Sequence, residues 1–284
     1  GSVMKIFTYM CAIEKGTYDG SKTYLSGNIE IEGTKIYDWN TVGWGEITFD
    51  QGFVLSSNVA TSNIVNQFIT KDDLKDCLES YGFGSATGIE LPRELSGSLV
   101  FNYPVEVAAA SYGQGITTTP IQHLQALSII ANNGYMVKPN IVSKIVENGQ
   151  VIYERQVEKS DRIVSESTIE QIKQLMYDAI HDEENEAVGL DYRVEGLDVI
   201  GKTGTAEIYD DQNGGYLTGW LDHLYSFSGM FPKDDPEIII FVSVKRPNNG
   251  SNIGLKEMTQ SVMESIAKYK GLIGNNNSDD EVIK

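Results

Sequence analysis

The 284-residue chain combines an ordinary globular composition with a strongly acidic charge. Hydrophobic residues make up 40% and charged residues 22%, which excludes a wholly disordered, collagen-like or coiled-coil chain. Forty acidic against 22 basic residues leave a formal net charge of −18, which repels phosphate backbones and argues against general nucleic-acid binding. No apolar run approaches the roughly 18 residues of a membrane span, and the first residues lack the pattern of a signal peptide.

The first part of the chain is predicted to be mainly helical. Apolar residues at helical spacing predict an amphipathic helix over 2–15. Residues 27–40 alternate like a small hairpin, and residues 53–69 are predicted to be helical again. Thr70 caps a further helix that ends near Gly82. A buried helix at the start needs partners from elsewhere, so we expect the chain to be a fragment of a longer protein.

The second part is predicted to form a sheet with flanking helices. A loop-rich stretch over 83–117 precedes a helix that starts with the capping box Thr119-Pro120-Ile121-Gln122. The later predicted elements are strands within 137–165, a helix over 166–182, strands over 197–208, 223–231 and 237–245, and a helix over 254–270. Short connections between the last three strands predict an antiparallel meander. The predicted folded domain spans 1–272, followed by a polar tail or linker over 273–284.

Ser2 and Lys5 are a candidate nucleophile and base. They are three residues apart at the start of a helix, so their side chains share one face. A lysine can take the proton of a serine hydroxyl only when its own pKa is lowered. Lowering that pKa from about 10.4 to near 7 costs roughly 4–5 kcal/mol, which requires burial and a second positive charge. The stretch Lys202-Thr203-Gly204-Thr205 supplies a second lysine on a predicted strand.

Three short motifs together carry more information than each alone. Ser56-Ser57-Asn58 offers a second hydroxyl to relay protons and an amide to hold a substrate carbonyl. Alone, the three motifs are equally well explained as a helix start, a loop and a strand end. In this order they form the signature of penicillin-binding proteins and serine β-lactamases. Four further stretches resemble the transpeptidase domain of class B penicillin-binding proteins: Asp38-Trp39-Asn40, Ser111-Tyr112-Gly113-Gln114-Gly115, Thr119-Pro120-Ile121-Gln122 and Asn213-Gly214-Gly215-Tyr216.

This resemblance implies an α/β fold of the α+β type, with helices on both faces of an antiparallel sheet whose N-terminal strands are missing from this chain. It also implies a serine D,D-transpeptidase that cross-links peptidoglycan without a cofactor. Ser2 would attack the D-Ala–D-Ala carbonyl while Lys5 accepts its proton. Ser56 would relay a proton to the departing D-Ala, Asn58 would orient the stem peptide, and Lys202 would tune Lys5.

The resemblance also implies where the substrate binds. The hydroxyls of Thr203 and Thr205 would meet its terminal carboxylate, and Gly204 would let it approach the strand. The oxyanion would lie between the backbone N–H groups of Ser2 and Thr205. The implied partners are two stem peptides, one the D-Ala–D-Ala donor and one the amine acceptor, and β-lactams that acylate the same serine.

The family further implies a place on the outer face of the bacterial cytoplasmic membrane, anchored by the chain's own missing N-terminal segment. A glycosyltransferase of the division or sporulation machinery is a further expected partner. Two alternatives stay open. A serine β-lactamase would need a glutamate such as Glu94, and a non-catalytic β-lactam sensor would acylate without cross-linking.

Cys11, Cys77, Asp222 and His223 form a candidate zinc site. These residue types are common zinc ligands, and the chain is similar to clostridial class B enzymes that carry a zinc motif of this kind. Cys11 lies nine residues after Ser2 on the same predicted helix and faces away from it, which suits a structural ion. The alternative is two small buried thiols and an exposed Asp-His pair.

Overall fold

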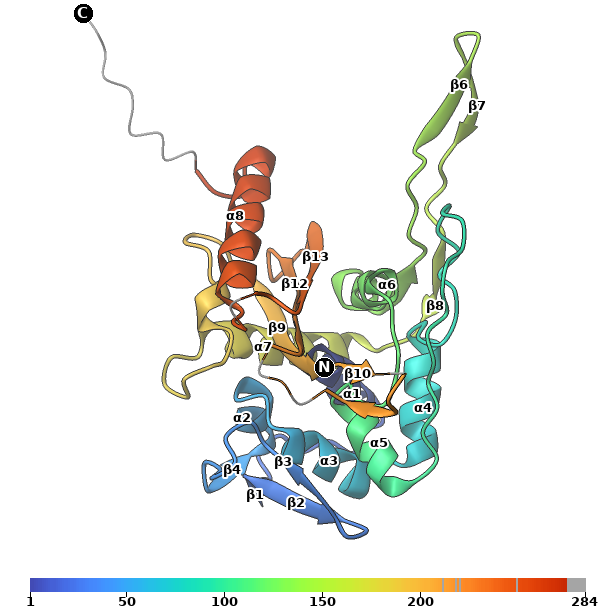
Figure 1. Cartoon of the computed structure of the whole chain (residues 1–284). Helices are drawn as coiled ribbons and strands as arrows, with labels where there is room; N and C mark the ends of the chain where they lie inside the picture. The colour runs from blue at the N-terminus through green and yellow to red at the C-terminus, as the bar shows by residue number, and fades with distance from the viewer. Residues whose placement is uncertain (211, 218, 220, 249, 275–284) are drawn as a thin grey trace, which may run out of the picture.

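The computed structural model describes residues 1–210, 212–217, 219, 221–248 and 250–274. At its centre, three antiparallel strands form a sheet in the order β13-β12-β9 (Figure 1). These strands are β9 (Ile200–Glu207), β12 (His223–Phe231) and β13 (Ile238–Lys245). The predicted meander is therefore confirmed, and β9 is an edge strand of this sheet within the described residues.

Helices and small hairpins surround this sheet. The remaining helices are η1 (Ser2–Met4), α1 (Lys5–Glu14), α2 (Phe49–Val54), α3 (Asn58–Gln67), α4 (Lys71–Ser80), α5 (Pro104–Ser111), α6 (Pro120–Ala131), α7 (Glu166–His181), η2 (Leu190–Tyr192) and α8 (Ile253–Lys270). The remaining strands are β1 (Thr23–Leu25), β2 (Asn28–Ile31), β3 (Thr34–Tyr37), β4 (Glu46–Thr48), β5 (Tyr135–Val137), β6 (Lys144–Glu147), β7 (Gln150–Glu154), β8 (Lys159–Arg162), β10 (Tyr209–Asp210) and β11 (Gly215–Tyr216). None of the described helices combines the length and the apolar character needed to cross a membrane.

The sheet is covered on both faces, as the α/β expectation requires. Successive residues of a strand point to opposite faces. On β12, Phe227 and Phe231 pack in a smaller apolar cluster that includes Met263 of α8, whereas Met230 belongs to the larger cluster around α1. Each face thus buries its own set of apolar side chains, and burial of this kind is the main favourable contribution to folding.

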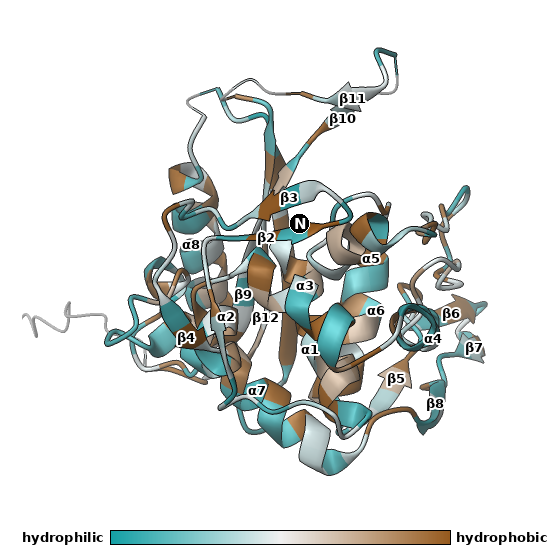
Figure 2. Cartoon of the chain, turned by 90° about the horizontal axis from the view of Figure 1, so that it is seen from below, coloured by the Kyte–Doolittle hydropathy of each residue, from teal (hydrophilic) through white to brown (hydrophobic). Residues whose placement is uncertain are grey.

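Helix α1 lies inside the protein and fixes the position of its N-terminal end. Eight of its ten residues are buried, and it contacts α3, α4 and α7. The sequence predicted an amphipathic helix, but its polar residues Lys5 and Thr8 are buried as well. Bands of polar and apolar residues are visible along the outer helix α7 in Figure 2. A helix held on all sides gives Ser2 and Lys5 a rigid base.

The capping box predicted at Thr119 is present and has a structural role. The Thr119 side chain accepts a hydrogen bond from the Gln122 N–H, and the Gln122 side chain accepts one from the Thr119 N–H. Gln122 also donates to the carbonyl oxygens of Ser85 and Ser96 at 2.7 and 2.8 Å. This motif therefore ties the preceding loop to α6. Helix α5 begins at Pro104 inside the stretch that was predicted to be loop-rich.

Two hairpins project from the body. The β6–β7 hairpin extends far from the other elements in Figure 1, and every residue of its two strands is exposed. The β10–β11 hairpin follows β9 directly and stands out in Figure 2. Because β10 begins two residues after β9 ends, the β10–β11 hairpin lies next to the C-terminal end of β9.

Candidate active site

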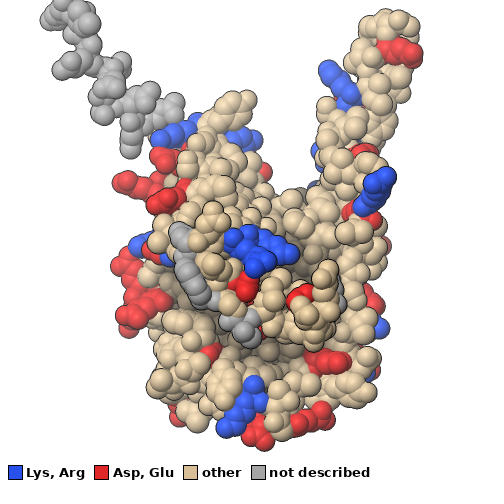
Figure 3. All heavy atoms as spheres, in the orientation of Figure 1, with Lys and Arg blue, Asp and Glu red and all other residues tan. Residues whose placement is uncertain are grey.

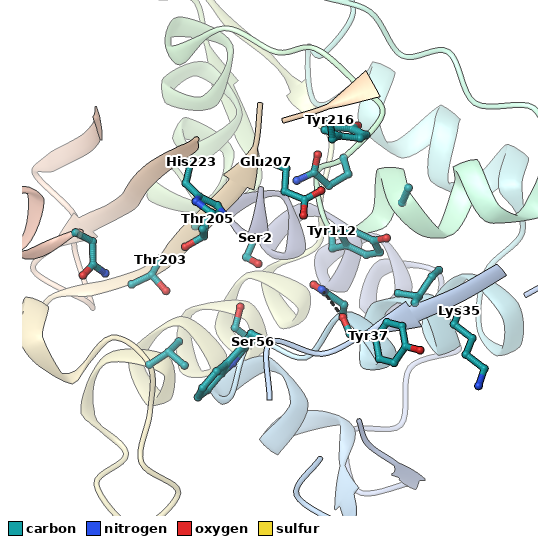
Figure 4. Close-up of a pocket in the computed structure, with 18 of the residues that line it drawn as sticks. Ser2, Lys35, Tyr37, Ser56, Tyr112, Thr203, Thr205, Glu207, Tyr216 and His223 are labelled. Carbon is teal, nitrogen blue, oxygen red and sulfur yellow. Dashed lines mark hydrogen bonds between the residues drawn. The ribbon is translucent and has the colours of Figure 1, made fainter. Parts of the chain in front are cut away.

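The predicted site residues meet at one cavity of about 730 Å³. It lies between the start of α1, the loop before α3 and the strand β9, and Figure 4 shows its side chains. The lining includes six residues expected from the sequence: Ser2, Ser56, Asn58, Thr203, Gly204 and Thr205. Lys5 and Lys202 are also on these elements, and both side chains are fully buried. Residues from both ends of the chain therefore share one pocket.

Ser2 lies in η1, at the point where the chain enters α1. In Figure 4 its side chain lies between Thr205 and Ser56. The Ser2 hydroxyl makes no hydrogen bond to the described part of the chain. It is thus available to a molecule in the cavity.

Lys5 is held by the loop that precedes α3. Its Nζ donates hydrogen bonds to the Ser56 carbonyl oxygen at 2.6 Å, to Asn58 Oδ1 at 2.8 Å and to Ser56 Oγ at 3.4 Å. Burial, and then the nearby charge of Lys202, hold the pKa of Lys5 well below its usual value, while Asp38 acts in the opposite direction. Both features that the sequence argument required of the base, burial and a second cation, are present.

Lys202 has little polar contact of its own. Its Nζ lies 3.5 Å from the Thr203 carbonyl oxygen and 5.8 Å from the centre of the Phe53 ring. Burial lowers the pKa of Lys202 to about 7. A buried ammonium with so few partners is costly to keep charged, because water no longer solvates it.

The Ser56-Ser57-Asn58 segment divides its side chains between the cavity and the protein interior. Ser57 caps α3 by accepting from the Ala60 N–H, and its hydroxyl donates to the buried Asp38 carboxylate at 2.8 Å. Ser56 has a φ of +59°, a left-handed conformation that costs a non-glycine residue about 1–2 kcal/mol. The Asp38–Ser57 contact helps to hold this strained turn, which directs Ser56 and Asn58 toward the cavity.

The β9 strand approaches η1 closely where the substrate is expected. A Cβ atom on Gly204 would lie 3.2 Å from Val3 Cγ1 and 3.3 Å from the Val3 nitrogen. Such contacts are tighter than nearly all real Cβ contacts, so glycine allows the strand to lie beside Ser2. The backbone of Thr205 and that of Ser2 are thereby brought to the same side of the cavity.

Several lining residues had no predicted role in the catalytic cavity, and one of them, His223, was predicted as a zinc ligand instead. Glu207, Tyr112, Tyr216 and His223 line the same cavity, and Lys35 lies at its edge (Figure 4). Glu207 could have been found, because residues two apart on a strand share a face and Thr205 was already assigned to the site. Tyr112 and Tyr216 lie in stretches that carried the family resemblance, but no role in the cavity was assigned to them.

The structure does not assemble the predicted zinc site. Cys11 and Cys77 form a disulfide with each other, with their Cα atoms 5.8 Å apart. His223 instead lines the cavity, and Asp222 pairs with Arg246 at 2.7 Å. In the described ranges, no group of three or more His, Cys, Asp or Glu residues could hold a metal ion. The zinc prediction is corrected: α1 and α4 are joined directly by a covalent bond.

Glu94 does not lie where a glutamate-activated water would be needed. Its carboxylate accepts hydrogen bonds from the Thr87 N–H, the Thr87 hydroxyl and the Gly88 N–H at 2.6–2.9 Å. Glu94 is also not part of the cavity lining. This carboxylate stabilises its own loop, so it lends no support to the β-lactamase alternative.

Comparison with known proteins places the chain in a family. Residues 1–268 match the penicillin binding protein transpeptidase domain, so the chain belongs to this family. It is 32% identical over 262 residues to Stage V sporulation protein D of Bacillus subtilis, covering 89% of this chain and 39% of that protein. It is 27% identical over 265 residues to a probable peptidoglycan D,D-transpeptidase, PenA of Neisseria flavescens, covering 89% of this chain and 59% of that protein.

Comparison with solved structures also finds penicillin-binding proteins. The crystal structure of penicillin binding protein 2X from Streptococcus thermophilus superposes with a TM-score of 0.87 at 29% identity, covering 96% of this chain and 41% of that one. The expected fold class, with helices and antiparallel sheet in the penicillin-binding-protein arrangement, is therefore confirmed. In these three comparisons, the chain spans less than two thirds of the length of the relative.

Proposed function

We propose that this chain catalyses the D,D-transpeptidase reaction of peptidoglycan cross-linking through an acyl-enzyme on Ser2. The observation that carries the proposal is the shared cavity, in which a serine hydroxyl with no hydrogen bond to the described residues lies one helical turn from a buried lysine of lowered pKa. Membership in the transpeptidase family supports the same reaction. The proposed catalytic domain spans 1–272.

In the first step, Ser2 Oγ bonds to the carbonyl carbon of the penultimate D-Ala and its proton passes to Lys5. A neutral lysine amine has two N–H donors and one lone pair. The Ser56 carbonyl oxygen and Asn58 Oδ1 can take both donors, which leaves the lone pair to accept a proton. We assign to Lys202 the role of keeping Lys5 neutral, because its charge lowers the pKa of Lys5.

The tetrahedral intermediate then breaks its C–N bond. Ser56 passes a proton to the nitrogen of the departing D-Ala, and Lys5 restores the Ser56 hydroxyl. The negative oxygen is proposed to lie between the Ser2 and Thr205 N–H groups, each of which can contribute on the order of 3–4 kcal/mol to the transition state. Thr203 and Thr205 hydroxyls would bind the terminal carboxylate, with Gly204 between them.

In the second step, the neutral amine of another stem peptide bonds to the acyl carbon while Lys5 takes its proton. The bond from that carbon to Ser2 Oγ then breaks, and Lys5 returns the proton to the Ser2 oxygen. β-Lactams would acylate the same hydroxyl and leave slowly. We propose that the reaction takes place outside the cytoplasmic membrane, with a preceding segment of the same protein as anchor. A glycosyltransferase of the division or sporulation machinery is a predicted partner.

Incubation with benzylpenicillin followed by intact-mass and peptide mass spectrometry tests the proposal. We expect one adduct per chain on Ser2 and none in Ser2→Ala. An unmodified wild-type chain would contradict the proposal. Steady hydrolysis of a chromogenic cephalosporin at many cycles per second would favour the β-lactamase alternative. A stable adduct without transfer of a donor peptide ester to an amine acceptor would favour the sensor.

A further inference from the structure

Three side chains follow one another along the cavity side of β9. Thr203, Thr205 and Glu207 are each two residues apart, so they lie on one face at intervals of about 7 Å. All three line the cavity. Two of them already have proposed roles toward the substrate's terminal carboxylate, whereas the mechanism leaves Glu207 unused.

Glu207 brings a carboxylate to the lining of the cavity. Among the described residues that line the cavity it is the one carboxylate, and it is exposed to solvent. Its side chain has no ion pair or hydrogen bond with the described part of the chain. Its cross-strand neighbour on β12 is His223, and Arg246, which follows β13, pairs with Asp222. Figure 3 shows acidic side chains around the margins of this face and also near its centre, beside a group of Lys and Arg side chains.

Two tyrosines complete this corner of the cavity. Burial first, and then the proximity of Tyr216 and Glu207, raise the pKa of Tyr112 to about 12. The Tyr216 hydroxyl accepts a hydrogen bond from the Gly115 N–H at 2.9 Å, which fixes its ring over the corner. In Figure 4, Glu207 lies between Ser2 and these rings, while Lys35 lies on the other side of the cavity. A carboxylate beside aromatic faces is a favourable environment for a cation.

The proposed function sets the direction in which a donor peptide would lie, and this inference rests on it. The terminal carboxylate is assigned to Thr203 and Thr205, and the acyl carbonyl to the Thr205 N–H. The donor backbone therefore runs antiparallel to β9, and the residues before D-Ala–D-Ala extend toward Glu207. Among the described residues, β9 pairs with β12 alone and leaves its other edge without a strand, which permits this added strand, since peptides often bind by extending a sheet at its edge.

We propose that Glu207, with Tyr112 and Tyr216 beside it, binds a cationic side chain on the donor-peptide residue that immediately precedes D-Ala–D-Ala. The ligand class is a diamino acid whose side-chain amine is free and protonated. Glu207 is then a specificity-determining residue for the donor. It takes no part in bond making or breaking.

The test compares two peptide esters that both end in lysyl–D-alanyl–D-lactate and differ only in the lysine side chain. One has a free ε-amine and the other an acetylated one. For the wild-type chain at low ionic strength, we expect kcat/KM for ester cleavage to be about two- to fivefold higher with the free amine, as exposed ion pairs usually contribute. The preference should shrink as salt is added, because salt screens exposed charges.

The variants separate this subsite from the chemistry. Glu207→Gln should bring the ratio of the two esters to about one, and Glu207→Lys should reverse it. Glu170→Gln, an exposed acid of α7 outside the cavity, should leave the ratio unchanged. If both esters are cleaved and the ratio of their kcat/KM values is the same in the wild type and the Glu207 variants, the cation subsite alone is overturned. No cleavage and no penicillin adduct in the wild type would overturn the proposed function as well.

Discussion

Lys5 and Asn58 are joined by a hydrogen bond of 2.8 Å from Nζ to Oδ1. The other amide atom of Asn58, Nδ2, donates to the Tyr37 carbonyl oxygen at 2.9 Å. The Asn58 amide therefore links the buried base on α1 to the strand β3. We infer that Asn58 first positions Lys5, and that its contact to a carbonyl of the stem peptide uses the second N–H of Nδ2.

Replacing Asn58 should change the pKa of Lys5 more than it changes the stability of the fold. In Asn58→Asp, a carboxylate beside Lys5 favours its protonated form and raises its pKa. Penicillin acylation at neutral pH should fall about 10- to 100-fold and recover as the pH is raised. Stopped-flow acylation measured from pH 6 to 10 checks this shift. Asn63→Asp, further along α3, is the control, and an unshifted pH profile for Asn58→Asp would contradict the role of Asn58 as a positioning residue.

Lys202 should make the stability of the protein depend on pH. Its folded pKa of about 7 lies below the ordinary value of 10.5, so the unfolded chain binds more protons between these limits. The free energy of unfolding should therefore rise as the pH increases from 7 to 10, by as much as about 4 kcal/mol. Lys202→Met should remove this contribution.

Urea unfolding at a series of pH values measures this contribution as the difference between the wild type and Lys202→Met. We expect Lys202→Met to be the more stable chain near pH 7 and its advantage to shrink toward pH 10. Lys144→Met on the exposed β6 serves as the control for loss of a lysine. A constant difference across the series would show that Lys202 is not titrating as inferred.

Much of the fold and the site could be predicted because local patterns and motifs agreed. The caps at Thr70 and Thr119 marked helix starts, and the short turns in the last three strands indicated the meander. The motif residues Ser2 and Lys202 could be assigned to one site before their positions were known. In each case the relevant information lay within a few residues or in a familiar order of motifs.

The rest depended on contacts between distant segments. The pairing of Cys11 with Cys77 follows from how α1 packs on α4, which no spacing in the sequence reveals. The left-handed conformation of Ser56 arises because the surrounding contacts hold the turn, although serine itself disfavours that conformation. Tyr112 and Tyr216 reach the cavity from separate elements. Sequence patterns describe single elements, whereas these features are properties of the packing.

The left-handed backbone conformation of Ser56 should lower the stability of the folded protein, and substitutions at this position can measure by how much. Glycine adopts a φ of +59° without strain, whereas alanine keeps the strain. Ser56→Gly should therefore be more stable than Ser56→Ala by about 1 kcal/mol in thermal or urea unfolding. Both variants lack the hydroxyl, so both should transfer donor peptide slowly. Equal stability of the two variants would contradict the strain argument, and full transfer activity in either would contradict the proton relay.

The disulfide between Cys11 and Cys77 should stabilise the native protein. It closes a loop with a sequence separation of 66 residues, and bridges of this kind usually contribute about 2–4 kcal/mol. Reduction, or the double variant Cys11→Ser with Cys77→Ser, should lower the melting temperature, whereas a chelator should leave it unchanged. Thiol titration of the unfolded, unreduced chain should find no free thiol. Two free thiols together with one equivalent of zinc in elemental analysis would contradict the disulfide and restore the metal site.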